Sequence, residues 1–103
     1  MVKHIDEKGL EEIENMKGVV LVDFYATWCP PCKKLAPVLD ELASSRKYNI
    51  ASINVDENTN VAVKYGVNTI PTLIVFKDGN PVRTSVGFID KEKVMEMMDE
   101  YID

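Results

Sequence analysis

Hydrophobic and polar residues along this chain follow two patterns, and the first of these indicates strands. Two runs are almost continuously apolar and rich in β-branched and aromatic side chains, which is typical of strands covered on both faces. Two later runs flank the pair Asp78-Gly79, which favours the tight turn of a β-hairpin. The pattern predicts strands at residues 19–26, 50–55, 72–76 and 81–87, and a short edge strand at residues 2–5.

The second pattern consists of apolar residues at helical spacing between those runs. The first such segment places Leu10, Ile13 and Met16 on one face. Pro37 lies inside the second segment and should kink it, because proline removes a backbone donor. Asp90 is expected to cap the last segment, whose methionines we interpret as core residues. Helices are therefore predicted at residues 6–16, 33–45, 56–65 and 91–101, with Leu35, Val38, Leu39, Leu42, Val94, Met97, Met98 and Tyr101 facing inward.

The order of these elements predicts an α/β fold. Early strands separated by helices imply parallel pairing with right-handed crossovers, and the terminal hairpin adds two antiparallel strands. We expect three layers, with a mixed sheet of about four or five strands between two layers of helices. No repeat, linker or low-complexity stretch interrupts the 103 residues, which predicts one domain over residues 1–103.

Composition and charge argue against nucleic-acid binding and membrane insertion as functions of this chain. The net charge of −5 is spread along the chain without a stripe of lysine and arginine, so binding to nucleic acid is not expected. No apolar stretch reaches the roughly 20 residues that span a bilayer, and residues 1–10 lack the apolar core of a signal peptide. We therefore expect a cytoplasmic protein that does not bind membranes.

Cys29 and Cys32 are the two cysteines of the chain, and their spacing suggests redox chemistry. Cytoplasmic thiols are kept reduced, so a disulfide there is usually transient and catalytic. Cys29 is expected at a helix cap, where free backbone donors and the helix dipole stabilise a thiolate, and Pro30 fits the first helical position. Because only a thiolate attacks a disulfide, the pair predicts thiol–disulfide exchange, with Cys32 the more buried and less reactive thiol.

Two other interpretations of the cysteine pair are weaker. A zinc site needs about four ligands, and the remaining candidates are carboxylates and the one histidine, His4, which we expect on the surface. A purely structural disulfide across so short a loop would constrain the unfolded chain little. Redox catalysis without a metal or cofactor is therefore the favoured interpretation.

The residues around the cysteines resemble a known family. Residues 23–37, DFYATWCPPCKKLAP, closely resemble the active-site segment of the thioredoxin family. The similarity continues in order and without insertions through Tyr65-Gly66-Val67, Ile70-Pro71-Thr72 and Val86-Gly87, and it covers essentially the whole chain. A Cys-x-x-Cys motif alone would be weak evidence, but its combination with the later Ile-Pro-Thr is specific. The resemblance implies a thioredoxin fold.

The resemblance also implies roles for individual residues. Cys29 matches the attacking thiol of the family and Cys32 the resolving thiol. Pro71 matches a cis-proline that faces the dithiol, and Ile70 would offer backbone hydrogen bonds to an extended substrate segment. The rest of the implied substrate groove consists of Pro30, Pro31, Gly87 and Trp28, the last of which we expect to be half exposed.

Asp23 lies in the middle of a predicted strand, on the same face as Leu21 and Tyr25, where a carboxylate is costly. Burial should raise its pKa and suit it to carry a proton. The resemblance implies that this acid helps to deprotonate Cys32. Many family members have a lysine opposite this acid, whereas this chain has Ser52, which supplies no positive charge.

The resemblance implies a protein disulfide reductase that is monomeric, takes electrons from a thioredoxin reductase and acts on disulfide-containing proteins. Pro30 replaces the glycine of the commonest family motif, and the resulting Trp-Cys-Pro-Pro-Cys string is also similar to tryparedoxins and nucleoredoxins, which are typically longer. Two further alternatives stay open here. One is a non-catalytic thioredoxin-fold binding module, which would need neither cysteine, and the other is an oxidase or isomerase, which depends on the reduction potential.

Overall fold

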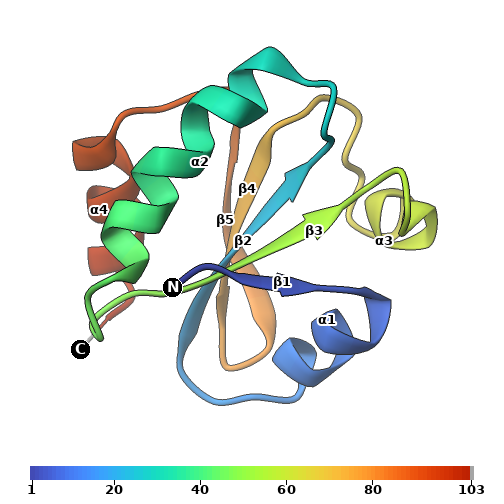
Figure 1. The fold of residues 1–103 in the computed structure, drawn as a ribbon. Coiled ribbons are helices and arrows are strands. Elements are labelled where there is room, and N and C mark those ends of the chain that lie inside the picture. The colour runs from blue at the N-terminus through green and yellow to red at the C-terminus, as the bar shows by residue number, and fades with distance from the viewer. Residues whose placement is uncertain (103) are drawn as a thin grey trace.

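Five strands form one mixed sheet in the computed structural model, which describes residues 1–102 (Figure 1). Their order across the sheet is β1-β3-β2-β4-β5, so the second strand of the sequence lies at the centre. The strands are β1 (Lys3–Ile5), β2 (Val19–Tyr25), β3 (Asn49–Asn54), β4 (Thr72–Lys77) and β5 (Asn80–Val86). All five predicted strands are thus confirmed, with ends that differ from the predicted ones by at most one residue.

The pairing of the strands follows the prediction from element order. β1 and β2 both pair parallel with β3, whereas β4 pairs antiparallel with β2 and β5 antiparallel with β4. Asp78 and Gly79 join β4 to β5 with φ angles of 50° and 85°, the positive values that a two-residue hairpin turn requires. A side chain at Gly79 would place its Cβ 2.1 Å from the backbone oxygen of Glu14, so only glycine fits this close approach.

Four helices cover the sheet in two layers (Figure 1). Helices α1 (Glu7–Glu14) and α3 (Thr59–Lys64) lie on one face, and α2 (Pro30–Ala43) and α4 (Lys91–Asp99) on the other. The side chains of Asp6 and Asp90 cap α1 and α4 by accepting hydrogen bonds from the backbone N–H groups of Gly9 and Lys93. The predicted three-layer arrangement and the cap at Asp90 are therefore confirmed.

Each layer of helices encloses its own apolar core against the sheet. Successive side chains of a strand point to opposite faces, so β2 contributes Leu21 to the core under α2 and α4, and Val22 and Phe24 to the core under α1 and α3. All three side chains are fully buried. At about 25 cal/mol per Å² of buried apolar surface, each stabilises the fold by roughly 1.5–3 kcal/mol. β2 is consequently held firmly on both sides.

Two helix boundaries differ from the prediction for local reasons. α1 ends at Glu14, and Met16, which was predicted on its buried face, is 43% exposed because Asn15 already forms the C-terminal cap. α3 begins at Thr59, although residue 56 was the predicted start. The side chain of Asn54 accepts a hydrogen bond from the backbone N–H of Asp56, and this turn competes with the first turn of a helix.

Candidate active site

Cys29 and Cys32 lie where β2 passes into α2. Cys29 is the N-cap residue of this helix, and the backbone N–H of Cys32 donates a hydrogen bond to its Sγ atom over 3.2 Å. Pro30 occupies the first helical position, where the missing N–H of proline has no cost. α2 therefore starts three residues earlier than predicted, and the two cysteines form a disulfide with 5.2 Å between their Cα atoms. The predicted dithiol at a helix N-terminus is present in its oxidised form.

Burial does not distinguish the two cysteines. Cys29 is 2% exposed and Cys32 is 4% exposed, so the prediction that Cys32 is the more buried of the two is wrong for the oxidised state. The closed disulfide packs both sulfur atoms into one small cluster with Ala26. Cys29 differs from Cys32 in its place at the helix cap, where its sulfur accepts the backbone N–H of Cys32.

The loop before β4 faces the dithiol. The Ile70–Pro71 peptide bond is cis, which confirms the predicted geometry of Pro71. The backbone oxygen of Ile70 lies 3.8 Å from Sγ of Cys29, and the oxygen of Pro71 accepts a hydrogen bond from the backbone N–H of Gly87 over 2.7 Å. Ile70, Pro71 and Gly87, which are far apart in sequence from Cys29, are thereby brought beside the disulfide.

Trp28 forms the other side of the same region. Its side chain is 65% exposed, and its Nε1–H donates a hydrogen bond to Oδ2 of Asp56 over 2.7 Å. No role was predicted for Asp56, which lies two residues after β3, at the end of the sheet where β2 also ends. Pro30 and Pro31, the first two residues of α2, are also exposed and follow Trp28 closely in the sequence. The indole ring is thus held in one orientation while its face stays open to a partner.

Asp23 lies in the middle of β2 and is only 4% exposed, as predicted. Its Oδ1 atom is buried and has no hydrogen-bond partner among residues 1–102. Burial raises the pKa of Asp23 from 3.8 to about 7, because the charged form loses its hydration. The carboxyl group points to the face of the sheet that α2 covers, since it alternates with Val22 and Phe24 on the opposite face. It can therefore exchange a proton near neutral pH on the side of the cysteine helix.

Ser52 is the direct neighbour of Asp23 on β3, and it is also buried. Its Oγ atom lies 2.8 Å from Nδ1 of His4, which is exposed on the edge strand β1. The surface position expected for His4 is confirmed. Among residues 1–102, no group of three or more His, Cys, Asp and Glu side chains is arranged to hold a metal ion. Nor does this part of the chain contain a helix that is long and apolar enough to cross a membrane.

Comparisons with known proteins agree with this geometry. The family model described as Thioredoxin matches residues 1–100. The chain is 56% identical over 104 residues to a thioredoxin from Staphylococcus aureus and 52% identical to one from Staphylococcus epidermidis, with 99% of this chain and 98% of each relative covered. A solved structure of a mutant thioredoxin from Halobacterium salinarum superposes with a TM-score of 0.91 at 37% identity, covering 98% of this chain and 90% of that one.

The relatives match the chain over nearly their whole length, and the solved structure shares its sheet and helices. With the disulfide at the start of α2 and the cis peptide bond before Pro71, these matches show that the chain belongs to the thioredoxin family.

Proposed function

We propose that this chain reduces disulfide bonds in other proteins by thiol–disulfide exchange, with Cys29 as the attacking thiolate and Cys32 as the resolving thiol. The observation that carries the proposal is the disulfide at the N-terminus of α2, facing the loop of Ile70 and Pro71. A binding module without catalysis would need neither cysteine, and a structural disulfide in so small a ring would stabilise the fold little.

The first step is attack on the substrate. In the reduced protein, the backbone N–H of Cys32 and the positive end of the α2 dipole stabilise a thiolate at Cys29. This thiolate attacks one sulfur of the substrate disulfide, and a bond forms between Cys29 and the substrate. The other substrate sulfur leaves as a thiolate and takes a proton from water.

The second step is resolution of this mixed disulfide. Cys32 gives its proton to the carboxylate of Asp23, and the resulting thiolate attacks Sγ of Cys29. The intramolecular disulfide forms, the second substrate thiolate leaves, and two electrons have passed from the dithiol to the substrate. The pKa of Asp23, raised to about 7 by burial, suits it to accept a proton and release it again at neutral pH.

The substrate groove that we propose surrounds Cys29. Ile70 supports this role because its backbone oxygen lies 3.8 Å from Sγ of Cys29, so an extended peptide that pairs with this residue would lie against the dithiol. Gly87 leaves open space where a side chain would stand. The groove residues are Trp28, Pro30, Pro31, Ile70, Pro71 and Gly87.

The wider setting of the reaction follows from family membership. We propose a thioredoxin reductase as electron donor, disulfide-containing proteins as targets, and no metal, cofactor or nucleic acid in the reaction. We further propose that residues 1–103 act as one domain and as a monomer. The site of action is then a reducing compartment, the cytoplasm, because the dithiol must be returned to its reduced form after each turnover.

Reduction of insulin by dithiothreitol tests the proposal. The reduced B chain of insulin precipitates, so turbidity reports catalysis directly. We expect the wild-type chain to accelerate precipitation, and the Cys29→Ser variant to give the rate of dithiothreitol alone. If the wild type also gave only that rate, the chain would be a binding module, and the exposed Trp28 would be the place to search for its partner.

A further inference from the structure

A row of three polar residues crosses the first three strands of the sheet. Ser52 on β3 is the register partner of Asp23 on β2 and also of His4 on β1. Register partners on neighbouring strands lie about 4.8 Å apart, with their side chains on the same face. The three residues therefore lie in one row from the central strand β2 to β1, the strand at the edge of the sheet (Figure 1), on the face that α2 covers.

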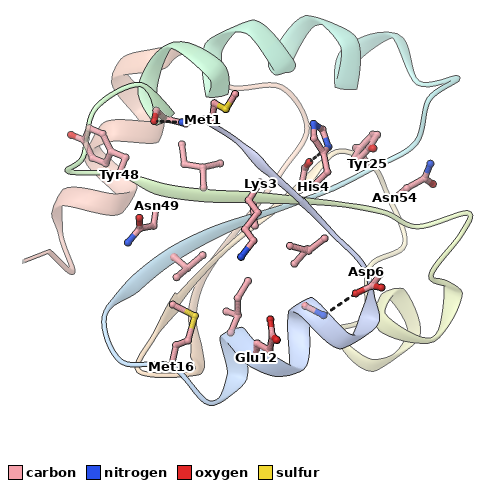
Figure 2. Close-up of a pocket in the computed structure, with 18 of the residues that line it drawn as sticks. Met1, Lys3, His4, Asp6, Glu12, Met16, Tyr25, Tyr48, Asn49 and Asn54 are labelled. Atoms are coloured by element: carbon pink, nitrogen blue, oxygen red, sulfur yellow. Dashed lines mark hydrogen bonds between the residues drawn. The ribbon is translucent and has the colours of Figure 1, made fainter.

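The two ends of this row differ in their access to water. Asp23 is buried, and its Oδ1 atom finds no partner among the described residues. Ser52 is equally buried, and its hydroxyl is already bonded to Nδ1 of His4. His4 is exposed and lines an open groove beside β1, where Figure 2 shows it on the α2 side of the strand next to Tyr25. Ser52 thus lies between a buried acid, Asp23, and a solvent-exposed base, His4.

We propose that Ser52 and His4 form a proton relay that connects the carboxyl group of Asp23 with solvent at the edge of the sheet. The relay rests on the proposed function, in which Asp23 accepts the proton of Cys32. A buried acid that receives a proton in each turnover must release it before the next, and the row supplies a path for that release. Ser52 and His4 are positioning residues that act through Asp23.

The proton moves along the row without net change in Ser52. The protonated carboxyl group passes its proton to Oγ of Ser52 through one bridging water, while Ser52 passes its own hydroxyl proton to Nδ1 of His4. His4 then releases a proton from Nε2 to the groove. The serine hydroxyl rotates back, and the exposed imidazole returns to its Nε2–H tautomer by proton exchange with solvent. Histidine suits this position because one ring nitrogen can accept a proton while the other donates one.

Other titratable groups near the row do not replace His4. Tyr25 makes an edge contact with the His4 ring, with 6.4 Å between ring centroids, but burial, Glu57 and Asp23 raise its pKa, so its phenol stays protonated. Glu57 reaches the same groove but is not in the row. The remaining charged residues that line the groove are Lys3, Asp6, Lys8, Glu12 and Arg46.

A single-turnover experiment separates the relay from the rest of the reaction. The chromogenic disulfide dithiobis(nitrobenzoate) releases one coloured thiolate when Cys29 attacks and a second when Cys32 resolves the mixed disulfide, so stopped-flow absorbance gives both rates. The variants are His4→Asn, which keeps a hydrogen bond to Ser52 but cannot carry a proton, and Ser52→Ala. Lys3→Ala is the matched control, because Lys3 is exposed on the same edge strand and points to the α1 side (Figure 2).

We expect the first phase to be unchanged in both relay variants. Below about pH 7, where Asp23 starts protonated because burial raises its pKa to about 7, the second phase should slow on the order of tenfold. Above that pH the rates should converge on the wild type. A third variant, His4→Ala, leaves space at the ring position. Imidazole in solution should restore its second phase, because it replaces the missing base, and should not affect Ser52→Ala. Lys3→Ala should behave as the wild type does.

The Asp23→Asn variant distinguishes two kinds of failure. If Asp23→Asn slows the second phase while His4→Asn and Ser52→Ala match the wild type at every pH, the relay is wrong and the role of Asp23 stands. If Asp23→Asn leaves the second phase unchanged, the proposed role of Asp23 is wrong and the relay falls with it. Slowing of His4→Ala without rescue by imidazole would also contradict proton transfer through this residue.

Discussion

The two faces of the central sheet use the same strands but contain different kinds of core. On the α1 and α3 face, Thr72 is the polar member among apolar buried residues, and its hydroxyl bonds to the backbone oxygen of Thr69. On the α2 and α4 face, Asp23 and Ser52 interrupt an apolar core, and one carboxylate oxygen has no partner in the described chain. On the first face, the buried hydroxyl has a hydrogen-bond partner nearby in the sequence. The second face contains a buried carboxyl group that can gain or lose a proton.

One strand can therefore contribute both to stability and to chemistry. Val22 and Asp23 are consecutive on β2, and their side chains enter opposite cores because a strand alternates its faces. The apolar side stabilises the sheet, and this stability offsets the cost of a buried acid on the other side. The cysteines lie at the N-terminus of α2, the helix that covers the face onto which Asp23 points. The predictions below test this division of roles.

The largest effect is expected at the reactive end of the α2 face. Cys29→Ser should abolish turnover, because no attacking thiolate is left, while Cys32→Ser should still attack a substrate and then stall as a mixed disulfide. Mass spectrometry after incubation with a disulfide substrate measures the adduct. A stable adduct on Cys29→Ser but none on Cys32→Ser would reverse the assignment of the two roles.

On the α1 and α3 face, the largest effect should be on stability alone. Phe24 is fully buried and packs near the ring of Tyr65, so Phe24→Ala should lower the free energy of unfolding by about 3–5 kcal/mol at every pH. Urea unfolding at about pH 6 and about pH 8 measures this loss. Phe24→Leu is a milder control, for which we expect a loss of less than about 1.5 kcal/mol. A strong pH dependence of the loss would show that the two faces are not independent.

Asp23→Asn should raise the free energy of unfolding, whereas Phe24→Ala lowers it, and it should do so only at higher pH. The native state keeps the proton of Asp23 up to its pKa of about 7, whereas the unfolded chain releases it near 3.8. The stability from this group is therefore full below about pH 3.8 and is lost as pH rises through about 7. At about 1.36 kcal/mol per pH unit, the loss is on the order of 4 kcal/mol above that range.

The asparagine variant removes this loss but leaves a buried amide, which costs about 1–3 kcal/mol. We therefore expect Asp23→Asn to be about 1–3 kcal/mol more stable than the wild type at pH 8 and to lose the advantage by about pH 5. Urea unfolding across this range measures the curve. The exposed Asp40→Asn on α2 controls for the lost charge. A variant less stable than the wild type at pH 8 would mean that Asp23 is not a strained buried acid.

The sequence predicted most of the fold because its two hydrophobic periods are strong and its turn residues are specific. Continuous apolar runs identified β2 and β3, and Asp78-Gly79 located the hairpin. The isolated carboxylate of Asp23 within an apolar strand was sufficient to predict its burial. Helix ends were less accurate, since the hydrogen bonds of Asn15 and Asn54 decide them and leave no periodic signal.

Contacts between distant segments were the part that the sequence alone did not supply. Trp28 and Asp56 are separated by 28 positions, and nothing local to either predicts their hydrogen bond. The hydrogen bond between Ser52 and His4 depends in the same way on strand order and register. β1 and β3 are far apart in sequence and become neighbours only in the folded sheet. The relative burial of Cys29 and Cys32 was misjudged because it depends on the closed disulfide and the packing around it.

The smallest effect is expected at Pro30, the first helical residue of the α2 face. Proline restricts the backbone conformations of the chain when the disulfide is open. Where the closed form already has a backbone that suits proline, this stabilises the closed form by about 0.4–1 kcal/mol. The loop between the cysteines then loses less entropy when the disulfide closes, so Pro30 favours the oxidised form. Pro30→Gly should make the protein slightly less reducing, by about 10–20 mV at about 30 mV per 1.4 kcal/mol.

Equilibration of the dithiol of the Pro30→Gly variant with a glutathione buffer measures this shift in potential. Pro81→Gly is a matched control, because Pro81 is also an exposed proline but lies on β5, outside the ring that the cysteines close, and should leave the potential unchanged. A shift above roughly 50 mV at Pro30 would exceed what backbone entropy can supply. The dominant influence of Pro30 would then be on the thiolate of Cys29 itself, through the hydrogen bond that its sulfur accepts from Cys32.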